Sequence, residues 1–282
     1  MATVTLEHVS YIYGKGTPFE IKALDDVSLT VKSGRVTGII GHTGSGKSTM
    51  VQLLNGLEKP EGGRVLLDGA DIWENPKNMQ AIRFRVGLVM QYPEYQLFEE
   101  TIEADIAFGP RNMGLDEEEI SKRVREAAAF VGLEPELLQK SPFDLSGGQK
   151  RRAAIAGVMA MRPEVLVLDE PAAGLDPRGR DIILRGIREY GERTGSTVII
   201  VSHSMEDMAA YCDDIVVMYQ AKVFLAGTRD EVFSHEGELA SVGLDVPQIT
   251  HLALLLKKRG VPLPDAIYTV EAARDCLRTL LQ

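Results

Sequence analysis

Residues 35–49 read RVTGIIGHTGSGKST, and this stretch decides the fold. Residues 35–40 form a short, mostly apolar run that predicts a strand, and a loop rich in glycine follows it. The next residues have the spacing of an amphipathic helix that ends near Gly56. The apolar positions of this helix are Met50, Val51, Leu53, Leu54 and Leu57. A strand, a glycine loop and a helix in this order are typical of a phosphate-binding loop.

The loop GHTGSGKST at 41–49 fits the pattern G-x-x-x-x-G-K-[ST], in which each residue type has a chemical role. Glycines let backbone N–H groups face a phosphate at the start of a helix. We expect Lys47 to reach the β- and γ-phosphates of a nucleoside triphosphate, and Ser48 to ligate Mg²⁺. The expected ATP-binding residues of the loop are Gly41, His42, Thr43, Gly44, Ser45, Gly46, Lys47, Ser48 and Thr49.

Two adjacent carboxylates close the apolar run EVLVLDEP at 164–171. An unpaired carboxylate at the end of a buried strand is costly, so we expect Asp169 to hold Mg²⁺ jointly with Ser48. Glu170 follows on the opposite pleat, where it would orient or deprotonate the water that attacks the γ-phosphate. A surface salt bridge is the alternative for Glu170.

Three further side chains are candidates for the same site. Gln91 ends the apolar run VGLVMQ at 86–91, and its neutral amide would contact both Mg²⁺ and the attacking water. His203 ends the run STVIIVSH at 196–203 and would donate to the γ-phosphate. Tyr13 precedes a glycine and would either stack on a nucleobase or serve in packing.

The wider pattern predicts an α/β fold. Residues 3–9 and 27–31 alternate apolar and polar positions, as half-buried antiparallel strands do, and 63–69 is a further strand. The uninterrupted apolar runs at 164–171 and 196–203 are typical of strands that are covered on both faces. We therefore expect an antiparallel lead-in, then a mostly parallel, doubly wound sheet with ligands at the carboxyl ends of its strands.

A helical insertion is expected at about residues 92–148. Its clearest helix begins at Asp116, has Glu119 as a capping-box partner and ends by Gly132. The apolar face of this helix consists of Ile120, Val124, Ala127, Ala128 and Val131.

The chain is expected to divide into a main domain, residues 1–235, and a small C-terminal extension, residues 236–282. Helical patterns at 248–259 and 269–281 make up most of the extension.

Composition argues against several classes of protein. The formal net charge of −10 opposes the phosphate neutralisation that drives nucleic-acid binding, so we expect no nucleic-acid partner. The basic clusters at 150–152 and 257–259 are expected to be solvated helix faces. No apolar run approaches the roughly 18 residues that cross a bilayer, and no secretory signal is present, which predicts a cytoplasmic chain. Cys212 and Cys276 are expected to be buried apolar thiols.

Residues 145–149 read LSGGQ, a second glycine turn for which a single nucleotide site has no use. The motifs follow one another in the order phosphate loop, Gln91, LSGGQ, VLVLDE at 165–170, AGLD at 173–176 and His203. This order resembles the nucleotide-binding domain of ABC transporters over about residues 3–235. The resemblance implies a P-loop NTPase fold and two such domains that pair head to tail.

In such a pair, the resemblance implies that the signature turn grips the γ-phosphate of ATP held by the partner's phosphate loop. A glycine turn at a helix N-terminus suits this role, because the helix dipole and free N–H groups favour an anion. The resemblance also implies that Asp176 lies at the dimer interface, that Tyr13 stacks on adenine and that the helical insertion meets the membrane subunit. The signature residues are Leu145, Ser146, Gly147, Gly148 and Gln149.

Two longer stretches narrow the resemblance. QYPEYQLFEETIEADIAFGPRNMGL at 91–115 and DVPQITHLALLLKKRG at 245–260 are similar to the ATPase subunits of energy-coupling-factor (ECF) transporters, which include cobalt and nickel importers. The His-Thr pair after Gly41 is more similar to the second of the two ATPases in shared vitamin-type systems. The extension resembles the family's C-terminal dimerisation helices, with simple capping of the domain as the alternative.

The resemblance therefore implies a Mg²⁺-dependent ATPase whose dimer closes on ATP and reopens on hydrolysis. The expected partners are a second copy or a sister ATPase, a transmembrane scaffold subunit and a membrane subunit that binds vitamins or transition-metal ions. The chain would then be a peripheral protein on the cytoplasmic face of the cell membrane.

Two other classes of protein remain open. A soluble ABC-type mechanochemical protein of DNA repair or translation would need long coiled-coil insertions or tandem cassettes, whereas each motif occurs once here. A P-loop metabolic kinase would need an acceptor pocket and would have no use for LSGGQ.

Overall fold

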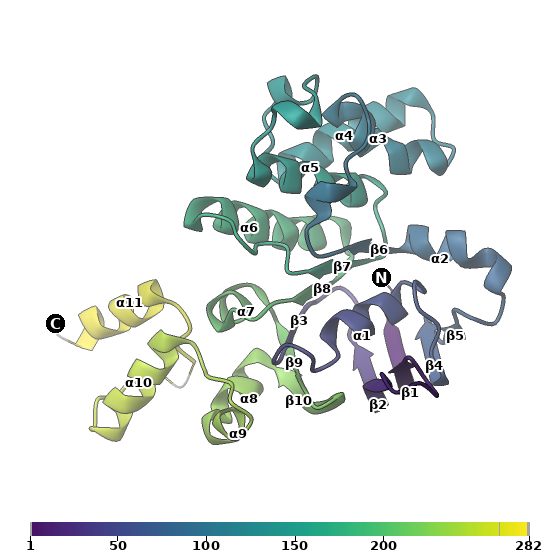
Figure 1. The fold of residues 1–282 in the computed structure, drawn as a ribbon. Coiled ribbons are helices and arrows are strands. Elements are labelled where there is room, and N and C mark those ends of the chain that lie inside the picture. The colour runs from purple at the N-terminus through teal and green to yellow at the C-terminus, as the bar shows by residue number, and fades with distance from the viewer. Residues whose placement is uncertain (1, 265, 281–282) are drawn as a thin grey trace.

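The computed structural model describes residues 2–264 and 266–280, which form two β-sheets with helices around them (Figure 1). One sheet has the strand order β2-β1-β4-β5, and the other has the order β10-β9-β3-β8-β7-β6. The strands are β1 (Val4–Tyr13), β2 (Ile21–Val31), β3 (Val36–Ile40), β4 (Gly62–Leu67), β5 (Ala70–Asp71), β6 (Val86–Val89), β7 (Val165–Asp169), β8 (Thr197–Val201), β9 (Asp214–Tyr219) and β10 (Lys222–Thr228). The α-helices are α1 (Lys47–Leu54), α2 (Met79–Arg85), α3 (Ile102–Asn112), α4 (Glu117–Phe130), α5 (Gly147–Ala160), α6 (Pro177–Thr194), α7 (Met205–Tyr211), α8 (Arg229–Ser234), α9 (Glu236–Ser241), α10 (Gln248–Lys258) and α11 (Val270–Leu280).

The larger sheet is mostly parallel, as predicted. β3 lies between β8 and β9 and pairs in parallel with both strands. β7 pairs in parallel with β6 and β8, and β10 alone runs antiparallel to its neighbour, β9. Every residue of β3, β7 and β8 is buried, because helices cover one face of this sheet and α1 together with the smaller sheet covers the other. The phosphate loop follows β3, and the predicted catalytic residues Glu170 and His203 follow β7 and β8. All of them therefore lie at the same edge of this sheet.

The antiparallel lead-in is confirmed, but β1 and β2 are longer than the alternation indicates. Val4 and Leu6 of β1 are buried, and the next buried residue is Val9, because a bulge shifts the inward positions by one residue. His8 lies in this bulge with φ of 51° and is exposed. Such a bulge interrupts the period of two on which strand prediction depends.

The predicted insertion at 92–148 contains α3 and α4, and α5, which begins at Gly147, lies with them at the top of Figure 1. α4 begins as predicted, since a carboxylate oxygen of Asp116 accepts from the backbone N–H of Glu119 at 2.9 Å. The second half of the predicted capping box is wrong. The Glu119 carboxylate instead pairs with Arg123 at 2.7 Å and with Arg162 at 3.0 Å, because two guanidinium groups lie within its reach. All predicted apolar-face residues of α4 are buried.

α4 and α6 pack unusually closely at Gly186. A Cβ on Gly186 would lie 1.7 Å from the backbone oxygen of Phe130, a group that cannot move aside without shifting α4. We therefore expect Gly186→Ala to lower the free energy of unfolding by about 3 kcal/mol, the upper end of usual overpacking costs. Urea denaturation of the nucleotide-free chain measures this change.

Gly179→Ala in the same helix is the matched control for that experiment. A Cβ on Gly179 meets nothing closer than an oxygen of Asp176 at 3.5 Å, so alanine fits there. We expect this variant to be neutral or to gain up to about 1 kcal/mol from its helix propensity. Equal stability of the two variants would contradict the packing argument.

The C-terminal extension contains the two helices predicted for it, α10 and α11, which project from the side of the molecule in Figure 1. These helices have a small core of their own, made by Ala253, Leu263, Ile267 and Ala273. Leu239, Val242, Leu244 and Val246 precede them and belong to the main core instead. The domain boundary at residue 236 stays a prediction.

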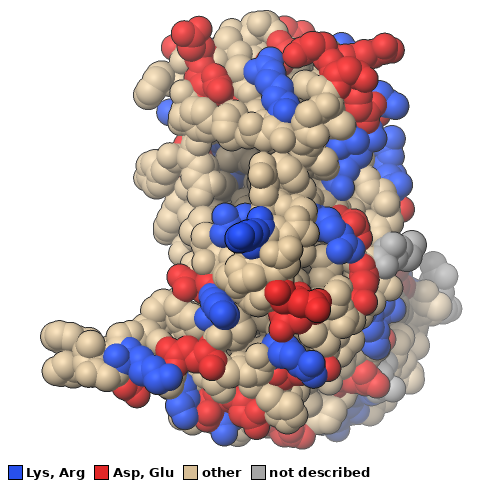
Figure 2. Space-filling model, turned by 90° about the vertical axis from the view of Figure 1, so that its right-hand side faces the viewer, with Lys and Arg blue, Asp and Glu red and all other residues tan. Residues whose placement is uncertain are grey.

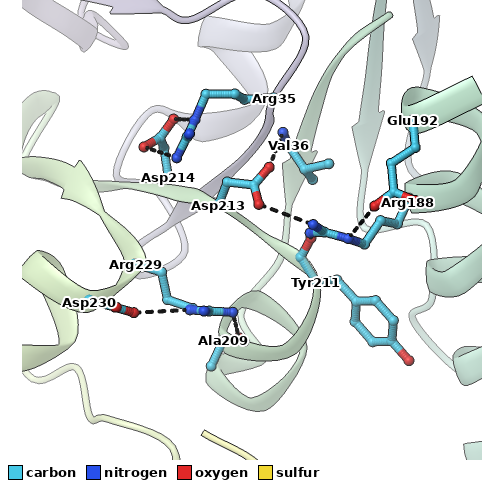
Figure 3. A network of polar contacts seen from close by, with 10 residues as sticks. All are labelled: Arg35, Val36, Arg188, Glu192, Ala209, Tyr211, Asp213, Asp214, Arg229 and Asp230. Atoms are coloured by element: carbon cyan, nitrogen blue, oxygen red, sulfur yellow. Dashed lines mark hydrogen bonds and ion pairs between the residues drawn. The ribbon is translucent and has the colours of Figure 1, made fainter. Parts of the chain in front are cut away.

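A polar network joins the sheet to the segment that leads into the extension (Figure 3). Asp213 accepts from the backbone N–H of Val36 at 3.0 Å and from Arg188 of α6 at 3.2 Å. Arg229 donates to the backbone oxygen of Ala209 at the end of α7 at 2.8 Å. Its guanidinium carbon also lies 4.6 Å from the ring centre of Tyr268. The segment before α11 is thereby held against α7 and α8.

The charged side chains differ from the prediction at one place. Arg151, in the cluster at 150–152, is only 5% exposed and pairs with Glu94 at 2.7 Å, so this cluster is not simply a solvated face. On the face that Figure 2 shows, Lys and Arg are interspersed with Asp and Glu.

Cys212 is buried as predicted, whereas Cys276 is only half-buried, and both are free thiols. No helix within the described ranges is both long and apolar enough to cross a membrane.

Candidate functional site

The phosphate loop connects β3 to α1, as the sequence predicts. Gly41 has φ of 150°, and a Cβ there would lie 2.3 Å from the backbone oxygen of Met218. Only glycine fits this close approach, which keeps the loop tight against β9. The loop therefore presents its backbone at the carboxyl end of β3, at the N-terminus of a helix, where anions bind favourably.

Lys47 already bonds to the loop that surrounds it. Its ammonium donates to the backbone oxygen of Gly41 at 2.6 Å and to that of His42 at 2.8 Å. Burial lowers the pKa of Lys47, while the charges of Glu170 and Asp169 act in the opposite direction. A triphosphate would give this half-buried ammonium the anionic partners that burial otherwise denies it.

Asp169 ends β7 and is 7% exposed. Burial raises the pKa of this carboxyl, and the hydrogen bond from Ser48 and the charge of Lys47 partly offset the effect. Gln91 lines one pocket together with Asp169, but it lies beyond β6, which ends at Val89. The prediction that Gln91 ends the strand is therefore wrong. The chain bends at Gln91, so this residue borders the site from the loop that follows β6.

Glu170 follows Asp169 in a strained conformation, with φ of 53°. Its backbone N–H donates to the backbone oxygen of Val201 at 3.0 Å, which holds it between β7 and β8. Left-handed backbone at a residue other than glycine is costly and gathers at functional sites. The side chain of Glu170 contacts His203, whose Nδ1 lies 2.8 Å from Oε1 of Glu170.

The hydrogen bond between His203 and Glu170 restricts what each group can do. Because an ionised carboxylate only accepts, His203 donates through Nδ1. Donation through Nε2 to a γ-phosphate then requires a ring that carries both protons or one that has released Glu170. The side chain of Glu170 is 12% exposed, whereas that of His203 is 76% exposed and free to change its direction.

Two adjoining pockets contain most of the predicted residues. The first has a volume of 280 Å³ and is lined by Tyr13, Ile21, Ala23, Thr43, Gly44, Gly46, Lys47, Ser48, Thr49, Gln91, Asp169 and Glu170. The second has a volume of 440 Å³ and is lined by Gly41, His42, Thr43, Lys47, Glu170, His203, Met205, Gly243, Leu244 and Asp245. Ser45 lines neither pocket, since it is buried inside the loop. Sequence reasoning missed Ile21, Ala23 and the residues 243–245, because apolar strand positions and a distant turn carry no phosphate-binding signal.

Tyr13 stands at the edge of the first pocket. Its hydroxyl lies 3.3 Å from Oγ1 of Thr49, and its ring meets the edge of Tyr11 with ring centres 4.8 Å apart. Tyr13 as a whole residue is 39% exposed. This position is compatible with both alternatives, since the ring packs on Tyr11 and still borders the space above the loop.

The signature turn lies at the start of α5, in the upper helical group of Figure 1, and none of its residues lines either pocket. Ser146 and Gln149 form a capping box: Oγ of Ser146 accepts from the N–H of Gln149 at 3.3 Å, and Oε1 of Gln149 accepts from the N–H of Ser146 at 2.9 Å. Leu145 is buried in the core. A Cβ on Gly147 would meet nothing within 4 Å, so the turn has open space in front of it.

Asp176 has a structural function in the single chain. Its Oδ1 accepts from the backbone N–H of Gly179 at 2.9 Å and caps α6. That hydrogen bond is the main cause of the lowered pKa of Asp176. The place of Asp176 at a dimer interface stays a prediction.

Together, the glycine loop before a helix and the buried carboxylate at the end of a parallel strand define a P-loop nucleotide-binding protein. Comparison with known proteins agrees, since the sequence pattern described as "ABC transporter" matches residues 24–173. A second pattern, described as "AAA domain, putative AbiEii toxin, Type IV TA system", matches residues 139–208.

Relatives cover nearly the whole chain. The "Energy-coupling factor transporter ATP-binding protein EcfA2" of Clostridium acetobutylicum is 54% identical over 98% of this chain and 98% of its own length. The structure of cbiO1 from Clostridium perfringens, described as part of the ABC transporter complex cbiONQ, is 41% identical and has a TM-score of 0.75 over 88% of this chain and 97% of that one. A dimeric ATP-binding cassette, MJ0796, bound to ADP and Pi, is 28% identical, with a TM-score of 0.72 over 80% of this chain and 98% of that one. The chain belongs to the ABC transporter family, among the ATP-binding proteins of energy-coupling factor transporters.

The raised pKa of Asp169 leads to a testable prediction for the nucleotide-free chain. A carboxyl whose pKa is higher in the folded state than in the unfolded state binds a proton more readily when folded. Asp169 therefore lowers the free energy of unfolding as the pH rises above its ordinary pKa of 3.8. We expect Asp169→Asn to raise the melting temperature at pH 7 and to abolish ATP hydrolysis. The gain in melting temperature should shrink as the pH falls toward 3.8.

Differential scanning calorimetry without nucleotide measures this effect. Asp275→Asn is the matched control, because the side chain of Asp275 is 65% exposed on α11 and its removal should leave the melting temperature nearly unchanged. A melting temperature of Asp169→Asn at or below that of the wild type at pH 7 would contradict the prediction.

Proposed function

We propose that this chain is the ATP-binding and ATP-hydrolysing subunit of an ECF-type importer and lies on the cytoplasmic face of the cell membrane. Its family membership supports the transport ATPase, and the names of its relatives support the ECF type. The transported compounds would be vitamins or transition-metal ions. The observation that carries the proposal is that Lys47, Asp169 and Glu170 line one pocket, while the signature turn lies elsewhere with open space before it.

The residues of the pocket have separate tasks in hydrolysis. Lys47 would exchange its two loop carbonyls for β- and γ-phosphate oxygens, and the loop N–H groups would hold the same phosphates. Glu170, held at the pocket by the strained backbone, would orient and deprotonate the attacking water. His203 would bond to the γ-phosphate once its ring has released Glu170 or has gained a second proton. Tyr13 would stack on the adenine ring.

The donor set at the phosphate loop fits Mg²⁺. Ser48 donates a hydrogen bond to Asp169, and Gln91 lines the same pocket, so three residues with oxygen ligands border one space. Oxygen ligands in small number, together with phosphate and water, are what Mg²⁺ prefers. When bound, the ion would neutralise charge that develops on the phosphates during cleavage.

ATP-driven dimerisation explains the signature turn. The free N–H groups of Gly147 and Gly148 at the N-terminus of α5, with the hydroxyl of Ser146, would bind the γ-phosphate of a nucleotide on the partner. The capping box between Ser146 and Gln149 fixes the turn beforehand, which reduces the entropy lost on binding. Moving an open-to-closed ratio from 99:1 to 1:99 takes about 5.5 kcal/mol of differential affinity, which two shared triphosphates would supply. Asp176 would lie at the same interface.

A groove on the helical insertion is suited to the membrane scaffold. It lies between α3 and α5, has a volume of 320 Å³ and includes Phe98, Phe108, Gly157 and Met161. Phe98 is 65% exposed and Phe108 43%, and their rings meet edge to face with centres 4.9 Å apart. Exposed aromatic rings beside an apolar groove are typical of a protein-binding site, and a helix of the scaffold would fit it.

The extension would add to the dimer. α11 is strongly amphipathic in sequence, and Leu252, Leu255, Val270 and Leu280 are each more than 40% exposed. These side chains would pack on the same helices of the partner, which is either a second copy or a sister ATPase. A third subunit, in the membrane, would bind the cargo.

A tagged pull-down in mild detergent, followed by mass spectrometry and an ATPase assay, tests this function. We expect the wild-type chain to capture an ATPase of the same family, a transmembrane scaffold and a membrane cargo-binding subunit. Phe98→Glu should lose the membrane subunits and keep ATP binding, because Phe98 does not line either nucleotide pocket. Phe224→Glu, which changes a 39% exposed phenylalanine on β10, is the matched control and should capture the full set.

Two results would count against the proposal. Capture of nucleic-acid or ribosomal proteins in place of membrane subunits would indicate a soluble ABC-type protein. ATP turnover that rises with small-molecule acceptors, and not with the membrane subunits, would indicate a kinase.

A further inference from the structure

The side chain of His42 connects the phosphate loop to the C-terminal part of the chain. Its Nε2 lies 2.8 Å from the backbone oxygen of Val242. A carbonyl oxygen only accepts, so Nε2 carries the hydrogen and donates it. The ring also lies directly against Gly243, where a Cβ would come within 2.9 Å of Nε2, and Gly243 has φ of 72°. Glycine at this position is therefore required for the contact.

Val242 belongs to a turn with a defined structure. α9 ends at Ser241, and the N–H groups of Gly243 and Leu244 close its end by donating to Ala240 at 3.0 Å and to Leu239 at 2.9 Å. The turn is anchored in the main core by buried side chains and leads through Pro247 directly into α10. Those anchoring residues are Leu239, Val242, Leu244 and Val246.

On the other side of the contact, the same histidine holds Lys47. The backbone oxygen of His42 accepts from the Lys47 ammonium at 2.8 Å and from the N–H of Ser45 at 3.1 Å. A triphosphate that draws the Lys47 ammonium away from this oxygen therefore changes the bonding of His42. The side chain of His42 is bonded to Val242, which lies 200 positions further along the chain.

The turn also forms part of the wall of the site itself. The second pocket brings Gly243, Leu244 and Asp245 together with Lys47 and Glu170 in one cavity. Its shape therefore depends on where the turn lies relative to the loop. Two independent features, the bond at His42 and this shared wall, connect the nucleotide site with the beginning of the extension.

We propose that His42 is a positioning residue that couples the state of the phosphate loop to the 239–246 turn, and through it to α10. The proposal rests on the ATP site described above and adds a path by which that site acts on the extension. Because coupling between two sites is reciprocal, an extension held by a partner would also change the affinity of the loop for nucleotide.

Hydrogen–deuterium exchange of the full-length chain, with and without a non-hydrolysable ATP analogue, tests the coupling. In the wild type we expect the analogue to change the exchange rates of amides in residues 239–246 by about five-fold or more, the lower end of usual coupling between sites. In His42→Ala, compared with the wild type at a concentration of the analogue that saturates each protein, the change in the turn should be lost. His42→Gln, which keeps a donor at a similar reach, should restore it.

Two further variants sharpen the experiment. His251→Ala removes another exposed histidine of the extension, one that pairs with Glu236 at 2.7 Å and does not contact the loop, so the response of the turn should persist. Gly243→Ala should lose the response as His42→Ala does, because its Cβ would displace the ring. A turn that does not respond in the wild type, or that responds equally in His42→Ala, overturns the inference. Failure of the wild type to bind the analogue would instead refute the proposed ATP site, and the inference with it.

Discussion

Glu170→Gln is expected to bind ATP normally and to hydrolyse it about a hundred-fold to ten-thousand-fold more slowly than the wild type, the usual contribution of a general base. The amide has the same shape as the carboxylate, and its oxygen still accepts from His203, so the site should keep its geometry. Only the ability to take a proton from water is lost. In the proposed cycle cleavage reopens the dimer, so the variant should accumulate as an ATP-bound closed dimer.

Single-turnover ATP hydrolysis and light scattering after gel filtration measure the two effects. Glu164→Gln is the matched control, since Glu164 immediately precedes the same strand, β7, at its opposite end and pairs with Arg85 away from the site. This control should hydrolyse ATP and dissociate like the wild type. Wild-type turnover in Glu170→Gln would refute the role of Glu170 and leave its contact with His203 as a surface ion pair.

Gly147→Asp should abolish hydrolysis without harming the folded chain. A side chain fits there, because a Cβ meets nothing within 4 Å, and an aspartate in the first turn of α5 favours the helix by about 0.3–1 kcal/mol. Nucleotide binding by the single chain should not change, since Gly147 lines neither pocket. In the closed dimer the new carboxylate would face the γ-phosphate, and like charges in contact cost several kcal/mol, which corresponds to at least a hundred-fold loss.

Three measurements test this prediction. Titration calorimetry measures nucleotide binding by the single chain, and gel filtration with ATP measures dimerisation. An ATPase assay of the complex that is purified through this chain measures hydrolysis. Gly237→Asp offers the same change at another open glycine in the first turn of a helix, α9, and should leave hydrolysis intact. If Gly147→Asp dimerises and hydrolyses ATP like the wild type, the signature turn does not bind the partner's nucleotide.

The sequence was most informative where one local pattern determines one local structure. The spacing around Lys47 predicted a strand, a loop and a helix, and the loop has that form because its glycines permit the close approach to β9. Likewise, four apolar residues before Asp169 predicted a buried strand with a carboxylate at its end. Both patterns depend on neighbours in sequence, so they can be read without knowing the fold.

Contacts between distant segments could not be predicted in this way. The bulge at His8 interrupts the period of β1, and Glu119 pairs with Arg162, which lies beyond α5, as well as with Arg123 of its own helix. The hydrogen bond between His203 and Glu170, and the place of Asp245 beside them, arise only when β7, β8 and the turn after α9 come together. No periodicity in the sequence predicts these contacts, because only tertiary packing creates them.

The backbone contact between Gly186 and Phe130 has a mechanical consequence. Helices separated by side chains can slide as those side chains change rotamer, whereas two backbones in contact have almost no compliance. If a membrane subunit displaced α4, as proposed above, the displacement would pass to α6 nearly undiminished, and α6 starts at Asp176. The two helices would then connect the insertion rigidly to the start of α6, where we predict the dimer interface.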